Sequence, residues 1–179
     1  MFIWKGRLRI SSGRSKSGAE RGKMIRLAKK EDAEQLLRLC NQFNGEGETS
    51  AAHIEQSILR NRQEIAVVAE EDGVLAGFVC VQMKKSLCYH AVSPEITEVF
   101  VCKEHRRRGL ASKMIAFAEA YCMEQGGVRR FELQTGEENF AAQALYRSLG
   151  YYEENEILME KAIGQTEPRK KERAERPGE

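Results

Sequence analysis

Apolar residues recur in the first half of the chain with two different periods. The segment MIRLA, from Met24, has the short apolar pattern of a strand. KKEDAEQLLRLCNQF follows with apolar residues three and four positions apart, which predicts a helix. Asp32 lies near its expected start, where a carboxylate meets unpaired backbone amides. After the loop NGEGETS, a similar spacing predicts a second, shorter helix that contains Ala52, Ile54, Ile58 and Leu59.

The pattern then changes to strands and back to helices. EIAVVAEEDGVLAGFVCVQMKK holds two β-rich runs joined by Glu-Asp-Gly, which predicts a hairpin. ITEVFVC predicts a third strand, and Gly109 and the pair Gly126-Gly127 flank a helix with a wide apolar stripe. A short strand in VRRFELQT, a helix over about 140–149 and a closing strand in YYEENEILMEKAI complete the order β-αα-βββ-α-β-α-β. This order predicts an α/β fold with a mixed sheet and helices on its faces.

Charge divides the 179 residues into three expected regions. Residues 1–23 carry seven Lys or Arg and one acid, a sum of +6, whereas the rest of the chain sums to −4. Because the basic residues surround the Ser/Gly-rich run SSGRSKSG, we expect residues 1–23 to be a disordered extension. Residues 24–163 are the expected domain, and residues 164–179 are expected to form a charged, flexible tail.

Composition narrows the function classes. No apolar run approaches the roughly 18 residues of a membrane span, so a cytoplasmic protein without a membrane partner is expected. The five cysteines lack the spacing of a metal site or of a disulfide framework, which predicts reduced thiols and no metal. One alternative function is a nucleic-acid binder that uses residues 1–23 and Arg106–Arg108. The lack of an aromatic and basic face argues against it.

The segment with the clearest chemistry joins the third strand of the hairpin region to the next helix. It reads KEHRRRGLA, and the pattern of Arg106, Gly109 and Ala111 is weak on its own. Its place before a helix makes it specific, because the first backbone N–H groups of a helix have no intrahelical partner and the helix dipole favours an anion there. Small residues at 109 and 111 let a phosphate approach the main chain, and the three arginines add charge. An ordinary helix start with a solvated basic cluster is the alternative.

Two segments carry a family resemblance. VFVCKEHRRRGLASKMIAFAEAY resembles the acetyl-CoA motif of the GNAT superfamily of N-acetyltransferases, and ELQTGEENFAAQALYRSLGY resembles the companion motif that follows it. The family often diverges two strands at this point, which opens a V-shaped site for acetyl-CoA as co-substrate. Lys103 departs from the proline that many members have. The resemblance implies cofactor contacts from Val99, Phe100, Val101, Arg106, Arg107, Arg108, Gly109, Leu110, Ala111, Ser112, Asn139 and Tyr146.

The resemblance also implies catalytic roles. An amine must lose a proton before it attacks a thioester, and Glu98 is the preferred base, with Glu95 next. Because side chains alternate along a strand, the two glutamates face opposite ways unless a bulge intervenes. Tyr146 is expected to protonate the departing thiolate, unless it is only a core aromatic, and Asn139 can also cap the last helix. His90, in a loop near the acceptor, and His105, expected to be exposed, are weaker bases.

The sequence therefore predicts an acetyl-CoA-dependent N-acetyltransferase that acts on a primary amine of a small molecule or a protein N-terminus. The alternative is a non-catalytic acetyl-CoA-binding regulatory domain. A thiol carrier at Cys80 or Cys102 is a further alternative to direct attack. The identity of the acceptor is left open, and a homodimer is expected because family members often pair through their final strands.

Overall fold

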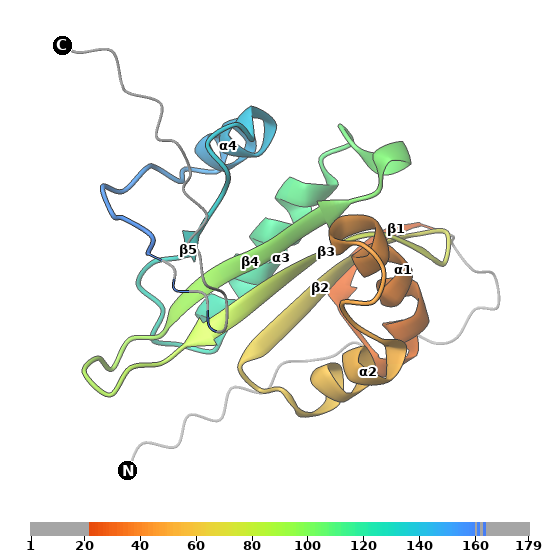
Figure 1. The fold of residues 1–179 in the computed structure, drawn as a ribbon, viewed down its shortest axis with the longest axis horizontal. Helices are drawn as coiled ribbons and strands as arrows, with labels where there is room; N and C mark the ends of the chain where they lie inside the picture. Colours follow the sequence, from red (N-terminus) through yellow and green to blue (C-terminus); the bar gives the residue numbers. More distant parts are fainter. Residues whose placement is uncertain (1–21, 160, 162, 164–179) are drawn as a thin grey trace. The chain divides into compact units, whose positions relative to one another are not determined.

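A computed structural model describes residues 22–159, 161 and 163. These residues divide into two compact units, the first ending at Phe140 and the second beginning at Ala141. The first unit contains a five-stranded sheet in the order β1-β2-β3-β4-β5, antiparallel except for the parallel pair β4–β5 (Figure 1). The strands are β1 (Lys23–Leu27), β2 (Glu64–Glu71), β3 (Val74–Lys84), β4 (Ser93–Val101) and β5 (Glu132–Leu133).

The predicted hairpin is confirmed as β2 and β3. Its turn consists of Asp72 and Gly73, with φ of 52° and 83°. Two consecutive residues with positive φ are typical of the hairpin turn whose twist matches that of the flanking strands, and Asp-Gly favours it. The turn therefore sets the register between β2 and β3.

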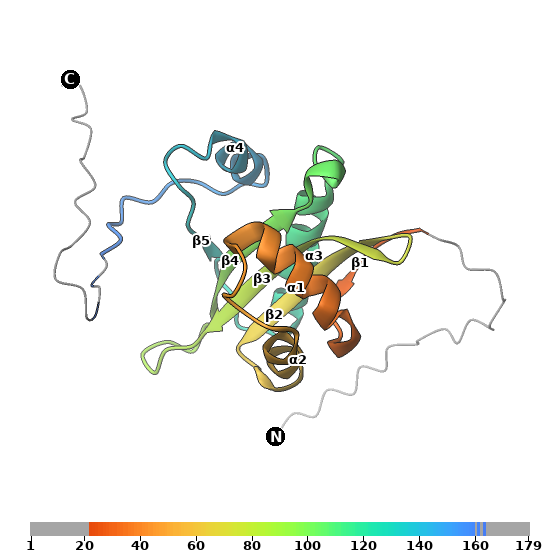
Figure 2. The same cartoon turned by 45° about the vertical axis from the view of Figure 1, so that its right-hand side comes forward.

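Helices cover both faces of the sheet in the first unit. The one-turn helix η1 (Lys30–Asp32), α1 (Ala33–Asn44) and α2 (Ala51–Arg60) lie on one face, and α3 (Leu110–Glu124) lies on the other (Figures 1 and 2). Helix α2 begins where the Ser50 hydroxyl accepts a hydrogen bond of 3.2 Å from the His53 amide. A second one-turn helix, η2 (Lys103–His105), precedes α3, and α4 (Phe140–Ser148) starts at the end of the first unit. No helix in the described residues is long and apolar enough to cross a membrane.

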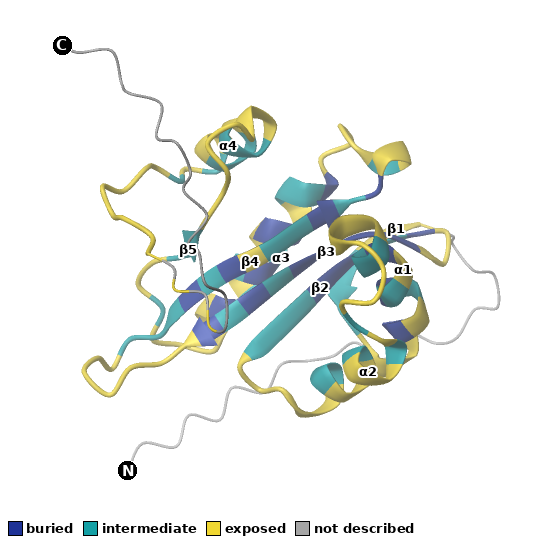
Figure 3. Cartoon of the chain, viewed as in Figure 1, coloured by how far each residue is buried: buried dark blue, intermediate teal, exposed yellow. Residues whose placement is uncertain are grey.

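The core is built on the central strands. On the α3 face, the largest side chains without solvent contact include Val67, Val79, Val81, Met114 and Ile115. On the α1 face, a second cluster contains Leu36, Leu39, Val68, Leu75, Phe78, Phe100 and Cys102. Figure 3 shows this burial concentrated on β2, β3, β4 and the inner side of α3. The strands that carry the candidate site are therefore held rigidly from both faces.

The expected closing strand is wrong for the described residues. Residues 151–159 have no regular secondary structure, and Ile157, Leu158 and Met159 are exposed. The segment starts with two tyrosines, and the polar run Glu153 to Glu156 follows. It therefore lacks the alternation of a strand with one buried face. The strand predicted in VRRFELQT is real but reduced to Glu132–Leu133, with an isolated bridge between Val92 and Val128.

Candidate active site

The loop before α3 presents backbone amides in one direction. Arg107 and Gly109 have φ of 63° and 75°, so the chain turns twice through the left-handed region before α3 starts at Leu110. The Lys113 amide donates to the Gly109 carbonyl at 3.1 Å. The amides of residues 110–112 precede this first helical bond and lack an intrahelical acceptor. Unpaired amides at a helix start can bind an anion, and a phosphate site at this loop stays a prediction.

The three arginines of the loop have different surroundings. Arg106 Nε donates to the Val101 carbonyl at 2.9 Å, and Arg108 Nη1 donates to Glu71 Oε2 at 2.8 Å. Within the described residues, Arg107 has no ion-pair partner. The sequence predicted three arginine charges around the phosphate site. Two of these guanidinium groups instead form hydrogen bonds within the protein.

His105 is not exposed as expected. Its side chain is partly buried, and its Nδ1 lies 2.7 Å from Glu71 Oε2. Glu71, the last residue of β2, is buried and also pairs with Lys23 at 3.1 Å. Burial opposes ionisation of Glu71, but hydrogen bonds from Lys23 and His105 and the charge of Arg108 hold its pKa below the usual value.

The edge of β4 near this loop is only partly covered. The ladder with β5 joins Glu95 to Glu132 and Ile96 to Leu133 and continues no further in the described residues. The edge from residue 97 to 101 thus extends beyond β5, which agrees with strands that diverge. Val99 and Val101 are partly exposed, whereas Phe100 is buried against Phe43 and Phe78 on the α1 face. Of the three residues predicted to meet the cofactor arm, Phe100 therefore points into the core.

A bulge in β4 decides where the two candidate bases point. Cys80 pairs with Glu98 and Val81 pairs with Ile96, so Thr97 has no partner of its own in the ladder. Gln82 pairs with Glu95, and residues 80 and 82 of β3 share one face of the sheet. Glu95 and Glu98 consequently lie on the same face, which corrects the expectation for a regular strand.

The two glutamates differ in their partners. Lys84 Nζ lies 3.1 Å from Glu95 and 3.0 Å from Glu132. Burial would lower the pKa of Lys84, but hydrogen bonds to Glu132 and Glu95 raise it above the ordinary value. Glu98 instead accepts a short hydrogen bond from the Thr97 hydroxyl. Glu95 therefore shares a lysine with Glu132, whereas Glu98 has no ion pair within the described residues.

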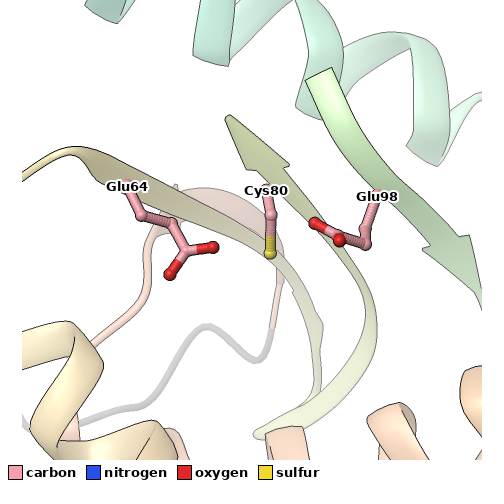
Figure 4. Close-up of side chains that lie close together, drawn as sticks. All are labelled: Glu64, Cys80 and Glu98. Atoms are coloured by element: carbon pink, nitrogen blue, oxygen red, sulfur yellow. The ribbon is translucent and has the colours of Figure 1, made fainter. Parts of the chain in front are cut away.

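Glu98 belongs to a group of three side chains at the bottom of a cavity. Glu64, Cys80 and Glu98 come from β2, β3 and β4, and one ligand atom from each lies within 4.8 Å of the other two (Figure 4). The cavity has a volume of about 390 Å³ and is lined on its helical side by Leu36, Phe43, His53, Ile54 and Ile58. His90 is exposed and is not among the lining residues, so the histidine at this cavity is His53.

The thiol in this group is held in its protonated form. Burial raises the pKa of Cys80 well above the usual value, and the negative charges of Glu98 and Glu64 add to the effect. Burial and the nearby Glu104 also raise the pKa of Cys102. Because the thiolate is the nucleophilic form, neither cysteine is activated for acyl transfer.

The family comparison matches this geometry. The model of the Acetyltransferase (GNAT) family matches residues 30–151, which include the bulged strand, the loop and the start of α3. The chain belongs to this GNAT family. It is an acetyl-CoA-dependent acetyltransferase, which favours the catalytic interpretation over a non-catalytic regulatory domain.

Curated proteins and solved structures extend this comparison. The chain is 28% identical over 136 residues to the uncharacterized N-acetyltransferase YhfO of Bacillus subtilis (strain 168), covering 73% of this chain and 90% of YhfO. AAC(6')-Iy, in complex with a CoA-S-monomethyl-acetylneamine bisubstrate analogue, has a TM-score of 0.69 at 24% identity, covering 79% of this chain and 98% of AAC(6')-Iy. The ribosomal-protein-alanine N-acetyltransferase of Brucella melitensis biovar Abortus 2308 has a TM-score of 0.66 at 18% identity, covering 79% and 100%. At these identities the two structures share the GNAT fold.

The second GNAT motif carries two predicted site residues. Asn139 is exposed and immediately precedes α4, and its amide donates to the Gly136 carbonyl at 3.0 Å. Tyr146 lies on α4 in the second unit, where its ring meets that of Tyr151 edge-on with centroids 6.0 Å apart. Burial raises the pKa of the Tyr146 hydroxyl above the usual value, so this group remains a proton donor at neutral pH.

Sequence reasoning missed Glu64, Glu71 and the bulge at Thr97. The bulge left a signal, because Thr97 and Glu98 are consecutive polar residues inside an apolar strand. Glu64 and Glu71 begin and end β2 and have the appearance of ordinary strand-end charges. Only the strand order places Glu64 beside Cys80 and Glu71 beside the loop.

Proposed function

We propose that this GNAT enzyme transfers the acetyl group of acetyl-CoA directly to a primary amine, with Glu98 as the base. The acceptor enters the cavity between α1, α2 and the sheet. Acetyl-CoA lies along the free edge of β4 with its pyrophosphate at the amides that start α3. The acceptor amine and the thioester then meet next to the bulge of β4.

One observation carries this proposal, namely the difference in pairing among the strand carboxylates. Glu70, Glu71, Glu95 and Glu132 each form an ion pair with a lysine or an arginine. Glu64 and Glu98 have no ion-pair partner within the described residues, although both line the cavity. In the described residues, the hydrogen bonds to Glu64 come from uncharged donors, which include Ser57 at 2.9 Å and Gln82 at 3.2 Å. Two carboxylates without a protein cation favour an acceptor that brings its own positive charge.

The chemistry follows from the protonation states. The acceptor arrives as an ammonium ion and gives one proton to Glu98, directly or through a water molecule. Its nitrogen then attacks the thioester carbonyl to form a tetrahedral intermediate. The C–S bond breaks as this intermediate collapses, and the nitrogen releases a second proton to solvent to leave a neutral amide. Tyr146 gives its proton to the leaving thiolate in the role that the family resemblance implies. The protonated thiols of Cys80 and Cys102 support direct transfer over a covalent acyl-cysteine.

The aminoglycoside acetyltransferase meta-AAC0020, from an uncultured soil metagenomic sample, was crystallised with sisomicin, and it has a TM-score of 0.69 at 16% identity. For this chain, the apolar helical wall and the carboxylates of the cavity favour an amine on a partly apolar stem.

A screen of primary amines for coenzyme A thiol release tests the proposal. With the best acceptor, Glu98→Gln should lower kcat by about 10²-fold or more, because the isosteric amide cannot accept the proton. Glu55→Gln removes an exposed carboxylate from the same side of the molecule and should leave kcat within about twofold. A Glu98→Gln enzyme with unchanged kcat at every pH would assign the proton to another group.

A further inference from the structure

Glu71 holds together the two ends of the loop that precedes α3. Its Oε2 lies 2.7 Å from His105 Nδ1, before the turn, and 2.8 Å from Arg108 Nη1, after it. The carboxylate is only 8% exposed, although it comes from β2, a strand that is distant in sequence. One buried side chain therefore ties the loop to the end of β2.

The chemistry of the three groups fixes their roles. A carboxylate only accepts hydrogen bonds and a guanidinium group only donates them, so His105 Nδ1 carries a hydrogen toward Glu71. Arg108 Nη1 and His105 Nδ1 are 3.1 Å apart because both donate to the same oxygen. Lys23 Nζ, at 3.1 Å, meets the other oxygen, Oε1. The carboxylate has a cation or a donor at each oxygen and is not available to a ligand.

The other hydrogen bonds of residues 103–107 in the described chain lie before the turn: Arg106 Nε donates to the Val101 carbonyl and the His105 amide donates to the Cys102 carbonyl, both at 2.9 Å. Arg107 has a φ of 63°, a left-handed backbone conformation that is unfavourable for an L-residue. The Arg106 amide donates to the Lys103 carbonyl at a long 3.4 Å. A conformation of this kind persists only where surrounding groups hold it, and the paired side chains of His105 and Arg108 flank the strained residue.

We infer that Glu71 is a positioning residue for the phosphate-binding loop, which it pins through His105 and Arg108 so that the amides before α3 converge on the pyrophosphate. This inference rests on the proposed binding of acetyl-CoA at that loop. It assigns Arg108 to the loop rather than to the phosphate, and it leaves Arg107 as the arginine available to the ligand.

Charge and positioning predict opposite results when Glu71 is changed. If Glu71 acts on the ligand only through its electrostatic field, removal of this negative charge next to an anion site should tighten acetyl-CoA binding. Loss of the anchor should weaken binding, because the ligand must then order the loop itself. Glu71→Gln is isosteric and removes only the charge, so the direction of the change in Kd separates the two effects.

Glu70→Gln is the matched control. Glu70 is the neighbouring residue of β2 and is also ion-paired, with Arg26 at 2.7 Å, but it does not contact the loop. Calorimetric titration with acetyl-CoA gives Kd for the wild-type enzyme and both variants, well below their unfolding temperatures. Hydrogen exchange of peptides that span residues 103–112 reports the order of the loop without any ligand.

Positioning predicts that Glu71→Gln raises Kd by about tenfold and speeds exchange in residues 103–112, while Glu70→Gln stays within about twofold on both measures. Equal or tighter binding by Glu71→Gln would overturn the inference, as would equal losses in the two variants. If the wild-type enzyme does not bind acetyl-CoA at all, the proposed function fails instead, so the two failures are distinguishable.

Discussion

Gly109 has a backbone conformation that few other residues adopt, at the point where a phosphate is expected. Its φ is 75°, and a side chain added there would meet no atom within 4 Å. We predict that Gly109→Glu folds but places bulk and negative charge against the pyrophosphate. At acetyl-CoA concentrations of about 100 times Kd, linkage stabilises the wild-type protein by about 2.7 kcal/mol, and this stabilisation should disappear in a thermal unfolding measurement.

Gly126→Glu provides the control at the other end of α3. Gly126 has a φ of 82° and equally open surroundings, so its substitution carries a similar backbone strain and the same charge. This variant should lose stability without ligand but keep the full acetyl-CoA shift. An undiminished shift in Gly109→Glu would refute the assignment of the loop as the phosphate site.

Tyr146 is predicted to act through its hydroxyl alone. The ring packs against Tyr151, and Tyr146→Phe keeps that contact while it removes the proton donor. We expect kcat to fall by about 10² to 10⁴-fold, with the KM for acetyl-CoA nearly unchanged. Steady-state rates should be measured with a good acceptor where chemistry limits turnover. A kcat equal to that of the wild type would make Tyr146 a core aromatic and leave the proton to water.

At the scale of elements, the apolar periodicity was sufficient to predict a helix or strand wherever that element buries one continuous face. The spacing of Ala33, Leu36, Leu37 and Cys40 predicted α1, and the turn at Asp72-Gly73 predicted the hairpin, because both signals are local. The bulge at Thr97 was not predicted, since it depends on how β4 pairs with β3. The sequence could therefore name Glu95 and Glu98 but could not decide that they share a face, nor that Lys84 pairs with Glu95 and not with Glu98.

The junction between β1 and α1 depends on a buried ion-pair network. Arg26 donates to both oxygens of Asp32, at 2.6 and 2.8 Å, and to Glu70 at 2.7 and 2.9 Å. Burial opposes ionisation of Asp32, but the hydrogen bonds from Arg26 and from the Lys29 amide hold its pKa below the ordinary 3.8. A depressed pKa means that this carboxylate stabilises the fold fully above its unfolded pKa and loses the effect as pH falls through the folded value.

We therefore predict a free energy of unfolding whose Asp32 contribution is constant from pH 7 to about pH 5 and is lost below about pH 4. Asp32→Asn should lower the free energy of unfolding by up to about 3 kcal/mol at pH 7, because it leaves Arg26 with Glu70 alone. It should also make that free energy depend less on pH in the acid range, which is the acid limb of the pH profile. Glu31→Gln, one residue earlier and exposed, should change neither. Denaturant unfolding across this pH range measures all three proteins. An acid limb as steep in Asp32→Asn as in the wild type would contradict the role of this network.

At the scale of the whole molecule, the order of elements predicted the class of sheet but not all its strands. Alternating helices and strands indicated a mixed sheet, and the parallel β4–β5 pair confirms it. The predicted closing strand is absent from the described residues 151–159, because its polar run from Glu153 to Glu156 lacks the alternation of a strand with one buried face. Glu71 shows the same limit, since its role depends on β2 ending beside a loop more than thirty residues away in sequence.

The N-terminal boundary of the domain gives the last prediction. The basic extension lies outside the described residues except for Gly22 and Lys23, and β1 begins at Lys23, one residue before the expected start at Met24. Lys23 is half-exposed and pairs with the buried Glu71, so solvent screens this ion pair on the lysine side. A chain that begins at Gly22 should therefore bind acetyl-CoA within about threefold of the full chain and with the same salt dependence. A chain that begins at Met24 should bind acetyl-CoA only slightly more weakly.

A loss of affinity above about tenfold, near 1.4 kcal/mol, in the chain from Gly22 would show that the basic residues 1–21 take part in binding. A steeper salt dependence in the full chain would identify them as phosphate contacts.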